Sequence, residues 1–177
     1  MEFSFNVDLG VKYSRKKAID FLKVAGPVIV GKAAENVNET LKGNSKGQLA
    51  NSIYPDRVDE KNLKINIYAN TVYAKIQHEG GDIIPKKAKA LAIPYSAETK
   101  AIAIPEGKSI RDIFPDLYFR PHKTGKSLGG LYKKMGKGKN DVLMYLLVDK
   151  VHLNGKFYLK NAMLSETPKI LQQMGVN

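Results

Sequence analysis

The stretch from Val72 to Pro94 reads Val-Tyr-Ala-Lys-Ile-Gln-His-Glu-Gly-Gly-Asp-Ile-Ile-Pro-Lys-Lys-Ala-Lys-Ala-Leu-Ala-Ile-Pro. It predicts a short helix that Thr71 caps, because a Thr hydroxyl accepts a backbone N–H of the first helical turn. The pair Gly80-Gly81 ends this helix, since glycine adopts a positive φ without a steric penalty. The chain is then extended up to Pro85, because a residue before proline avoids the helical conformation. Leu91–Ile93 is predicted to be a short strand, stopped by the proline that follows it.

The same stretch resembles the signature of tailed-phage tail-completion and head–tail joining proteins, the Mu-type virion-morphogenesis family and its relatives. The shared motifs lie between Gly47 and Pro94. They are Gly47-Gln48-Leu49, Ser52-Ile53, Tyr73-Ala74, His78-Glu79-Gly80-Gly81, Pro85-Lys86, Ala88-Lys89, Ala90-Leu91 and Ile93-Pro94. The family's aromatic residue after Glu79 is replaced by glycine, and of its Pro-x-Arg-Pro-Phe-Leu run only an aromatic residue and Leu159 are found here.

The resemblance implies a structural, non-catalytic protein that acts in virion assembly, at tail completion or at the head–tail junction. It implies contacts that close a homo-oligomeric ring, with other phage head–tail or tail proteins as partners, and it leaves a non-specific contact with packaged DNA open. The implied location is the host bacterial cytoplasm during assembly and then the virion. His78, Gly80, Gly81 and Pro85 would form a rigid structural turn within the signature.

Length and composition limit the possible fold classes and functions independently of this resemblance. A chain of 177 residues predicts a single domain, and 43% hydrophobic with 26% charged residues is ordinary for a globular protein. There is no cysteine, which excludes disulfides, thiolate zinc sites and cysteine nucleophiles. The first eight residues lack the basic start and apolar run of a signal peptide. The apolar stretches are shorter than the ~20 residues that a membrane-spanning helix needs, so no membrane partner is expected.

The formal net charge is +12, and the basic residues gather in two places. We predict these residues to face a partner or DNA: Lys86, Lys87, Lys89, Arg120, Lys123, Lys126, Lys133, Lys134, Lys137 and Lys139. The second group falls in a glycine-rich segment without periodicity, which predicts a mobile basic loop at about 120–140. Two interpretations stay open with equal weight: a solvated loop, or a surface that faces an anionic partner.

Periodicity elsewhere predicts an α+β fold, with a long, kinked N-terminal helix and a C-terminal helix packed on a small antiparallel sheet. The N-terminal helix begins after Ser14 and carries one continuous apolar stripe, and Gly26-Pro27 predicts a kink or a break in it. Apolar and polar residues alternate over Leu63–Ala69, which predicts an antiparallel strand. The C-terminal helix spans Tyr158–Met174, with a fresh start at Thr167-Pro168. Short helical turns are predicted at Gly47–Ser52 and from Ser109. The predicted strands are Phe3–Leu9, Ile53–Val58 at a sheet edge, Leu63–Ala69, Ala101–Ala103, Leu117–Phe119 and a fully buried Val142–Val148.

Most motifs that would indicate catalysis, phosphate binding or metal binding are excluded. Gly125-Lys126-Ser127 resembles the end of a phosphate-binding loop, but Arg120 occupies the place of the required first glycine. The three histidines His78, His122 and His152 have no metal-ligand spacing, which favours a packing role for His78. We therefore expect no enzyme activity, no cofactor, no metal and no small-molecule substrate.

The alternative function is that of a stand-alone basic nucleic-acid-binding protein, since the basic clusters could neutralise phosphates. Tyr118, Phe119 and Tyr132 could stack on bases, although core packing explains the first two equally well.

Overall fold

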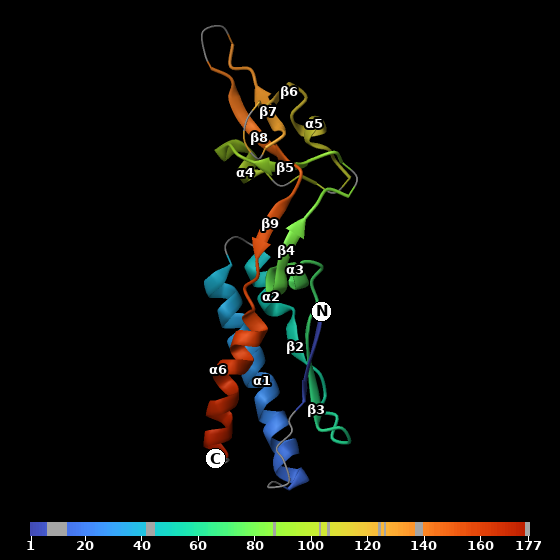
Figure 1. The fold of residues 1–177 in the computed structure, drawn as a ribbon, viewed down its shortest axis with the longest axis vertical. Coiled ribbons are helices and arrows are strands. Elements are labelled where there is room, and N and C mark those ends of the chain that lie inside the picture. Colours follow the sequence, from blue (N-terminus) through green and yellow to red (C-terminus); the bar gives the residue numbers. More distant parts are fainter. Residues whose placement is uncertain are drawn as a thin grey trace. The chain divides into compact units, whose positions relative to one another are not determined.

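A computed structural model describes residues 1–6, 14–41, 45–86, 88–102, 104–105, 107–123, 125, 127–136 and 140–175. The chain is α+β, as predicted, and its long N-terminal helix packs against its C-terminal helix. It divides into two compact units (Figure 1). Unit 1 comprises Met1–Gly81 and Leu153–Asn177, and unit 2 comprises Asp82–His152. Whether these units act as one domain stays a prediction.

Two helices frame unit 1. Helix α1 spans Arg15–Thr40 and helix α6 spans Tyr158–Gln173, and the two lie side by side (Figure 1). Ser14 caps α1 as predicted, because its hydroxyl oxygen accepts the Lys17 N–H at 3.5 Å. The apolar stripe of α1 is buried, since residues three or four apart share one face of a helix. Its buried members include Ala18, Leu22, Ala25, Ile29, Ala33 and Val37.

Neither proline in these helices ends the helix. Helix α1 continues without a break through Gly26-Pro27, and the predicted fresh start at Thr167-Pro168 is wrong because α6 runs through it. An interior proline costs roughly 3 kcal/mol, which the burial of the two packed helices offsets. Gly26 has a packing role: a Cβ atom added there would lie 2.4 Å from Cδ1 of Ile65. Because Gly26 has no Cβ atom, the sheet can approach the helix closely.

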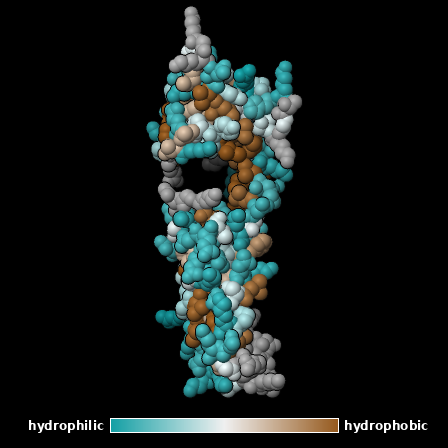
Figure 2. Space-filling model, turned by 90° about the vertical axis from the view of Figure 1, so that its left-hand side faces the viewer, coloured by the Kyte–Doolittle hydropathy of each residue, from teal (hydrophilic) through white to brown (hydrophobic). Residues whose placement is uncertain are grey.

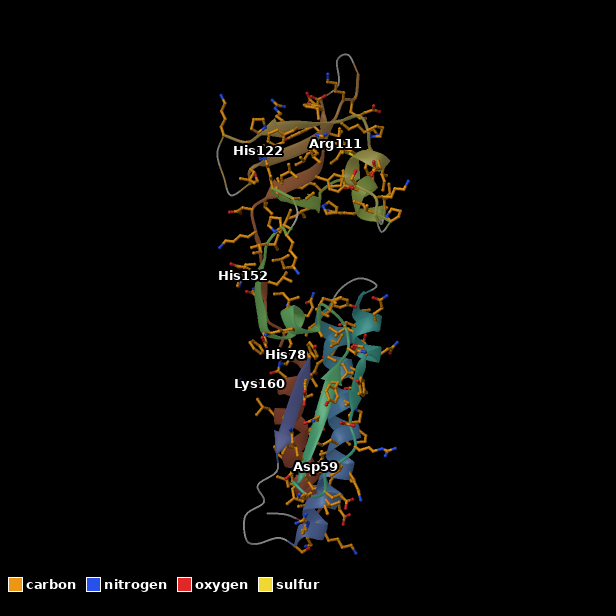
Figure 3. All side chains as sticks on the ribbon, turned by 90° about the vertical axis from the view of Figure 1, so that its right-hand side faces the viewer. Asp59, His78, Arg111, His122, His152 and Lys160 are labelled. Atoms are coloured by element: carbon orange, nitrogen blue, oxygen red, sulfur yellow. The ribbon has the colours of Figure 1, made fainter. Side chains whose placement is uncertain are left out.

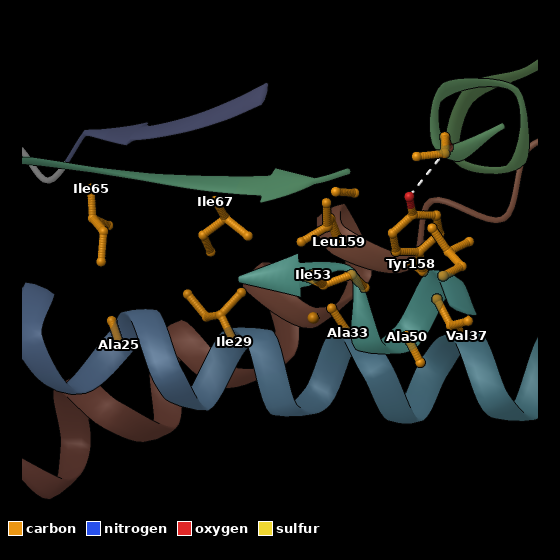
Figure 4. Close-up of a cluster of buried hydrophobic side chains, with 14 of the residues drawn as sticks. Ala25, Ile29, Ala33, Val37, Ala50, Ile53, Ile65, Ile67, Tyr158 and Leu159 are labelled. Atoms are coloured by element: carbon orange, nitrogen blue, oxygen red, sulfur yellow. Dashed lines mark hydrogen bonds between the residues drawn. The ribbon is translucent and has the colours of Figure 1, made fainter. Parts of the chain in front are cut away.

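Unit 1 also holds a three-stranded antiparallel sheet in the order β1-β3-β2. Its strands are β1 (Glu2–Asn6), β2 (Ile53–Pro55) and β3 (Lys64–Ala69), and helix α2 (Ser45–Asn51) precedes β2. The prediction that β2 is an edge strand is confirmed. The alternation in β3 is confirmed too: Ile65 and Ile67 point toward Ala25 and Ile29 of α1 (Figure 4). Tyr158 and Leu159 of α6 complete this core.

The signature stretch forms helix α3 (Ala74–Glu79), followed directly by strand β4 (Gly80–Ile83). The predicted cap by the Thr71 hydroxyl is wrong: the helix begins later, and it is the Thr71 carbonyl that accepts the Ala74 N–H at 3.1 Å. The predicted stop at Gly80-Gly81 is confirmed, with φ values of 78° and 131°.

Unit 2 contains a four-stranded antiparallel sheet in the order β5-β8-β7-β6. The strands are β5 (Leu91–Pro94), β6 (Leu117–Pro121), β7 (Gly129–Lys133) and β8 (Val142–Val148). Helices α4 (Ala97–Ala101) and α5 (Ile110–Ile113) pack against this sheet around Phe114, Met144 and Tyr145. Strand β9 (Val151–Asn154) pairs with β4 in a separate two-stranded sheet.

The predicted mobile loop at about 120–140 is wrong over Gly129–Lys133, because these residues form β7 inside the sheet. The glycines of this segment suggested flexibility, but in the structure they allow close packing between neighbouring strands. A Cβ atom on Gly129 would lie 2.5 Å from the carbonyl oxygen of Arg120, and one on Gly130 would lie 2.4 Å from Cδ1 of Leu143. Residues 137–139, the end of the predicted loop, lie outside the described part.

Other predictions for unit 2 have mixed outcomes. The strands at Leu91–Ile93 and Leu117–Phe119 are confirmed, as is the helical turn after Ser109, which forms a capping box with Asp112. The strand Ala101–Ala103 is wrong for Ala101, which ends α4; β5 pairs with β8 instead. Val142–Val148 is a strand but is not fully buried, because Val142 at its start is 38% exposed.

Candidate functional site

The basic residues predicted to face a partner all belong to unit 2. This unit has fourteen Lys and Arg residues against seven Asp and Glu residues, which gives a formal net charge of +7. The structure describes Lys86, Lys89, Arg120, Lys123, Lys133 and Lys134, whereas Lys87, Lys126, Lys137 and Lys139 lie outside the described residues. The charge imbalance gives unit 2 a positive field suited to an anionic partner.

Side chains of the β6–β7 hairpin alternate between two faces of the sheet. Tyr118 pairs directly with Tyr132, and Arg120 with Gly130, so these four positions share one face. Leu117 and Leu131 belong to the other face and pack into the core with α5. The hairpin therefore presents aromatic and basic side chains on the face that lies opposite the core of unit 2.

Two tyrosines and two cations meet on that face. The Tyr118 and Tyr132 rings lie with their centroids 6.0 Å apart and their planes tilted by 32°. The Arg120 guanidinium lies 5.8 Å from the Tyr132 ring centre, and the Lys134 ammonium 5.7 Å from that of Tyr118. The negative ring faces attract these cations. We name Tyr118, Arg120, Tyr132 and Lys134 the tyrosine–cation patch.

Hydrogen bonds hold both tyrosine hydroxyl groups in place. The Tyr132 hydroxyl lies 3.0 Å from Nε2 of His122, whose Nδ1 lies 2.6 Å from the Ser127 hydroxyl. The Tyr118 hydroxyl donates to the Asp141 carboxylate, and this bond raises the pKa of Tyr118. Figure 3 shows His122 beside the hairpin. Both rings are consequently fixed at their outer ends as well as at the backbone.

The structure separates the other described basic residues from this arrangement. Lys133 lies on the opposite face from Tyr132 and forms a 3.2 Å salt bridge with Glu98 of α4. Lys86, Lys89 and Lys123 are exposed on segments outside the four strands. Of the predicted basic residues that are described, Arg120 and Lys134 are therefore the two that the patch contains.

Sequence reasoning missed His122 and Asp141 as members of this site. The spacing of Tyr118 and Arg120 on β6, with His122 just after the strand, was a usable signal, because residues two apart share a face. The contacts of His122 with Tyr132 and of Asp141 with Tyr118 had no such signal. They depend on the register of β6, β7 and β8, which the neighbouring sequence does not specify.

His78 lies within the core of unit 1 rather than in a reactive site. Its side chain is 3% exposed, and its ring makes edge contacts with Tyr158 and Phe157, at 4.8 and 5.8 Å between centroids. Burial lowers the pKa of His78, with a smaller lowering from the nearby Lys160 ammonium (Figure 3) and an opposing effect of Glu79. Neutral His78 therefore acts as a packing residue, in line with the predicted structural role.

His152 has a carboxylate partner that its position in the sequence does not predict. Its Nδ1 lies 2.7 Å from the Asp82 carboxylate, which also binds the Lys150 ammonium at 3.2 Å. These two hydrogen bonds, that of His152 first, lower the pKa of Asp82. All three groups are exposed, so this cluster links the ends of β4 and β9 at the surface.

The described residues contain neither a metal-binding cluster nor a membrane-spanning helix. Within that part of the chain no three His, Cys, Asp or Glu side chains come together as a metal site would require. The described residues form a hollow of about 200 Å³ between Phe114, Leu117 and Lys133 in unit 2. Larger hollows of about 350 and 500 Å³ lie in unit 1, beside Glu35 and Val72 respectively. No helix in the described ranges has the length and apolar character needed to cross a bilayer.

Comparison with protein-family models, with curated proteins and with solved structures finds no match for this chain. Its fold and surface define an α+β protein of two compact units, one of which carries a cationic and aromatic sheet face. The resemblance to Mu-type virion-morphogenesis proteins stays a prediction.

Proposed function

We propose that this chain is a structural assembly protein of a tailed phage or prophage, which acts at tail completion or the head–tail junction. The observation that carries the proposal is the surface of unit 2. The hydrophobic cluster at its centre contains Phe114, Met144 and Tyr145, whereas ten of its described large apolar side chains are more than a third exposed. These are Ile83, Ile84, Ile93, Tyr95, Ile102, Ile104, Phe119, Leu128, Met135 and Val142.

Such a surface favours protein–protein contact. Figure 2 shows hydrophobic side chains gathered over a continuous area of unit 2. Complete burial of an exposed large apolar side chain contributes about 1.5–3 kcal/mol, and each of these partly exposed side chains would gain a share of that free energy at an interface. Contiguous apolar areas of this kind typically mark binding surfaces. Unit 2 therefore has apolar surface left to bury against another molecule.

The ring and the phage context come from the sequence resemblance. Identical subunits usually assemble with closed symmetry, and a tubular particle needs rotationally arranged contacts. The signature turn supplies a fixed geometry inside unit 1, because Gly80 packs directly on the backbone of Gly155. In this proposal the protein binds other head–tail or tail proteins, first in the host cytoplasm and then in the virion, and it performs no catalysis.

Matched substitutions test the role of unit 2. Ile84 in unit 2 is 62% exposed, and Leu164 on α6 in unit 1 is 66% exposed. Ile84→Asp should abolish particle assembly while the melting temperature stays nearly unchanged, since exposed substitutions typically alter stability by within about 0.5 kcal/mol. Leu164→Asp should assemble like the wild type. Normal assembly of Ile84→Asp contradicts the proposal.

Electron microscopy of the assembled particle tests the ring directly. We expect a rotationally symmetric ring of this chain at the end of the tail or at the head–tail junction. Scattered single copies without rotational symmetry would defeat the ring. Portal, capsid and tail genes beside the gene for this chain would favour assembly over the second candidate function.

That second function is stand-alone nucleic-acid binding, and it is favoured by the net charge of +7 on unit 2 together with the tyrosine–cation patch. A stand-alone role predicts salt-sensitive binding to nucleic acid by the isolated protein and no place in a virion.

A further inference from the structure

We propose that the tyrosine–cation patch on the β6–β7 hairpin is a binding site for single-stranded nucleic acid. The site consists of Tyr118, Arg120, Tyr132 and Lys134, with His122 as a positioning residue for Tyr132. This inference does not depend on the assembly role, because it concerns a binding property of the isolated chain.

The two rings are arranged as a stacking platform. Their centroids lie 6.0 Å apart with planes tilted by 32°, so the rings are not stacked face to face on each other. Both rings are only partly buried, and both hydroxyl groups are held by neighbours, His122 and Asp141. A ring that is already fixed loses little conformational freedom when a base stacks on it, which favours binding.

The two cations of the patch are available for phosphates. Among the described residues, neither Arg120 nor Lys134 makes an ion pair with a carboxylate, whereas Lys133 on the opposite face is paired with Glu98. Asp141 is the carboxylate that touches the patch, and it is engaged by the Tyr118 hydroxyl. Arg120 also lies beside Tyr132, where its planar guanidinium offers a further stacking surface.

This combination fits a single strand better than a duplex or an acidic protein. Unpaired bases stack on exposed aromatic side chains while basic side chains follow the backbone, and this mode tolerates any sequence. In a duplex the bases stack on one another inside the helix, so the tyrosine rings would add nothing. An acidic peptide would use Arg120 and Lys134 but would gain no stacking from the fixed rings.

Fluorescence anisotropy with a labelled oligothymidylate tests the proposal on the full chain at low salt. An oligonucleotide of about 12 nucleotides lies within the usual range of site sizes for single-strand binders. We expect it to bind more tightly than a duplex of the same length. Combining Tyr118→Leu and Tyr132→Leu should weaken single-strand binding by about thirtyfold or more, because two base–ring stacks are lost.

Variants that remove the two charges of the patch are compared with a control that removes two charges elsewhere in unit 2. Arg120→Gln with Lys134→Gln should weaken binding and reduce the salt dependence by about 0.7 in the log–log slope for each phosphate that the variant no longer neutralises. Arg111→Gln with Lys108→Gln removes the same two charges from unit 2, and Arg111 lies on α5, which packs on the opposite face (Figure 3). This control should bind like the wild type. Equal losses of affinity in both pairs would show a general charge effect and overturn the site.

Photochemical crosslinking of the wild-type chain needs no variant and so covers the case of a misfolded tyrosine variant. The crosslinked peptide should contain Tyr118 or Tyr132. Three results would overturn the proposal: no single-strand binding at low salt, crosslinks confined to unit 1, or equal affinity for duplex with no effect of the tyrosine variants. None of them would touch the assembly proposal, which the particle experiments test.

Discussion

A Cβ atom added to Gly80 would lie 2.5 Å from the backbone nitrogen of Gly155, so these two glycines meet backbone to backbone. Just before Gly80, the carbonyl groups at the end of α3 are bonded by the same distant segment. The Lys156 N–H donates to the Gln77 carbonyl at 3.0 Å, and the Phe157 N–H to the His78 carbonyl at 2.9 Å. The last carbonyl groups of a helix have no hydrogen-bond donor within the helix. Here the segment that leads into α6 provides the backbone N–H donors.

This junction predicts that Gly80 tolerates no side chain. Its φ of 78° and ψ of −169° fall in a region that is essentially restricted to glycine, where other residues pay about 1–3 kcal/mol. Gly80→Ala should therefore lower the free energy of unfolding in urea by at least that amount, with the clash against Gly155 in addition. Gly81→Val should be destabilising too, because a φ of 131° strains any side chain there and the Ile76 side chain, 3.2 Å from an added Cβ atom, has to move.

The matched control for this prediction is Gly31→Ala. Gly31 lies inside α1, and a Cβ atom there has nothing within 4 Å. Alanine should stabilise the helix interior by about 0.5–1 kcal/mol. Wild-type stability of both Gly80→Ala and Gly81→Val would show that the turn is assigned wrongly.

Amide hydrogen exchange should separate β7 from a flexible loop. Strand β7 lies between β6 and β8, so the amides of Gly129–Lys133 have strand partners on both sides. We expect slow exchange for this segment in the free protein, since ladder hydrogen bonds must open before exchange. Exchange as fast as in an unstructured peptide would restore the original prediction of a mobile loop.

The pH dependence of stability should report on His78. Burial lowers its pKa below the ordinary value of 6.5, so the unfolded state binds a proton more readily than the folded state. Stability from this group is fully present above pH 6.5, and it is lost as the pH falls from there toward the folded-state pKa.

Urea denaturation at pH 7.5 and at mildly acidic pH gives the measurement. The wild type should be less stable in acid, and His78→Gln should show a smaller difference between the two conditions. His152→Gln serves as the control, because its side chain is 65% accessible. Since His152 also bonds to Asp82, the acidic condition is kept above the range in which carboxylates titrate. An unchanged pH difference in His78→Gln would show that other groups cause the acid sensitivity.

The sequence predicts the parts of this fold whose residues repeat with a regular period. The stripe of α1 and the alternation of β3 are confirmed, because each pattern by itself specifies one buried face. The same holds for the stop at Gly80-Gly81, where the steric freedom of glycine is decisive. Helix α4 and strand β9 were missed, since elements of four or five residues hold too few repeats to define a period.

The candidate site was predictable in its residue types and not in its geometry. Arg120 and Lys134 were expected to face a partner, and Tyr118 and Tyr132 were considered for stacking. Their meeting depends on strand register and on the close approach that Gly129 and Gly130 allow, in the case of Gly130 to Leu143. Glycine has two physical uses, flexibility and close approach, and the sequence alone did not distinguish them here.

Thr99 should prove to be the residue that anchors α4 to the sheet of unit 2. It is 1% exposed, and its hydroxyl lies 3.0 Å from the Met144 carbonyl of β8. Thr99→Val keeps the shape but loses this bond and the 3.0 Å hydrogen bond with the Ser96 hydroxyl, whereas the Met144 carbonyl keeps the Tyr95 N–H at 2.8 Å. The cost should therefore be about 2 kcal/mol, the net value of two hydrogen bonds without an orphaned acceptor.

Thr40→Val is the matched control, because the Thr40 hydroxyl bonds to the Asn36 carbonyl within α1 at an exposed position. It should change the free energy of unfolding by less than about 0.5 kcal/mol.

Thr99→Ala should cost about 0.8 kcal/mol more than Thr99→Val for each buried carbon group it removes. Because Ser96 caps α4 next to this anchor and Glu98 of α4 pairs with Lys133 of β7, amide exchange in β7 should also become faster in the Thr99 variants. Equal stability of Thr99→Val and Thr40→Val would show that the buried hydroxyl contributes nothing to holding α4 on β8.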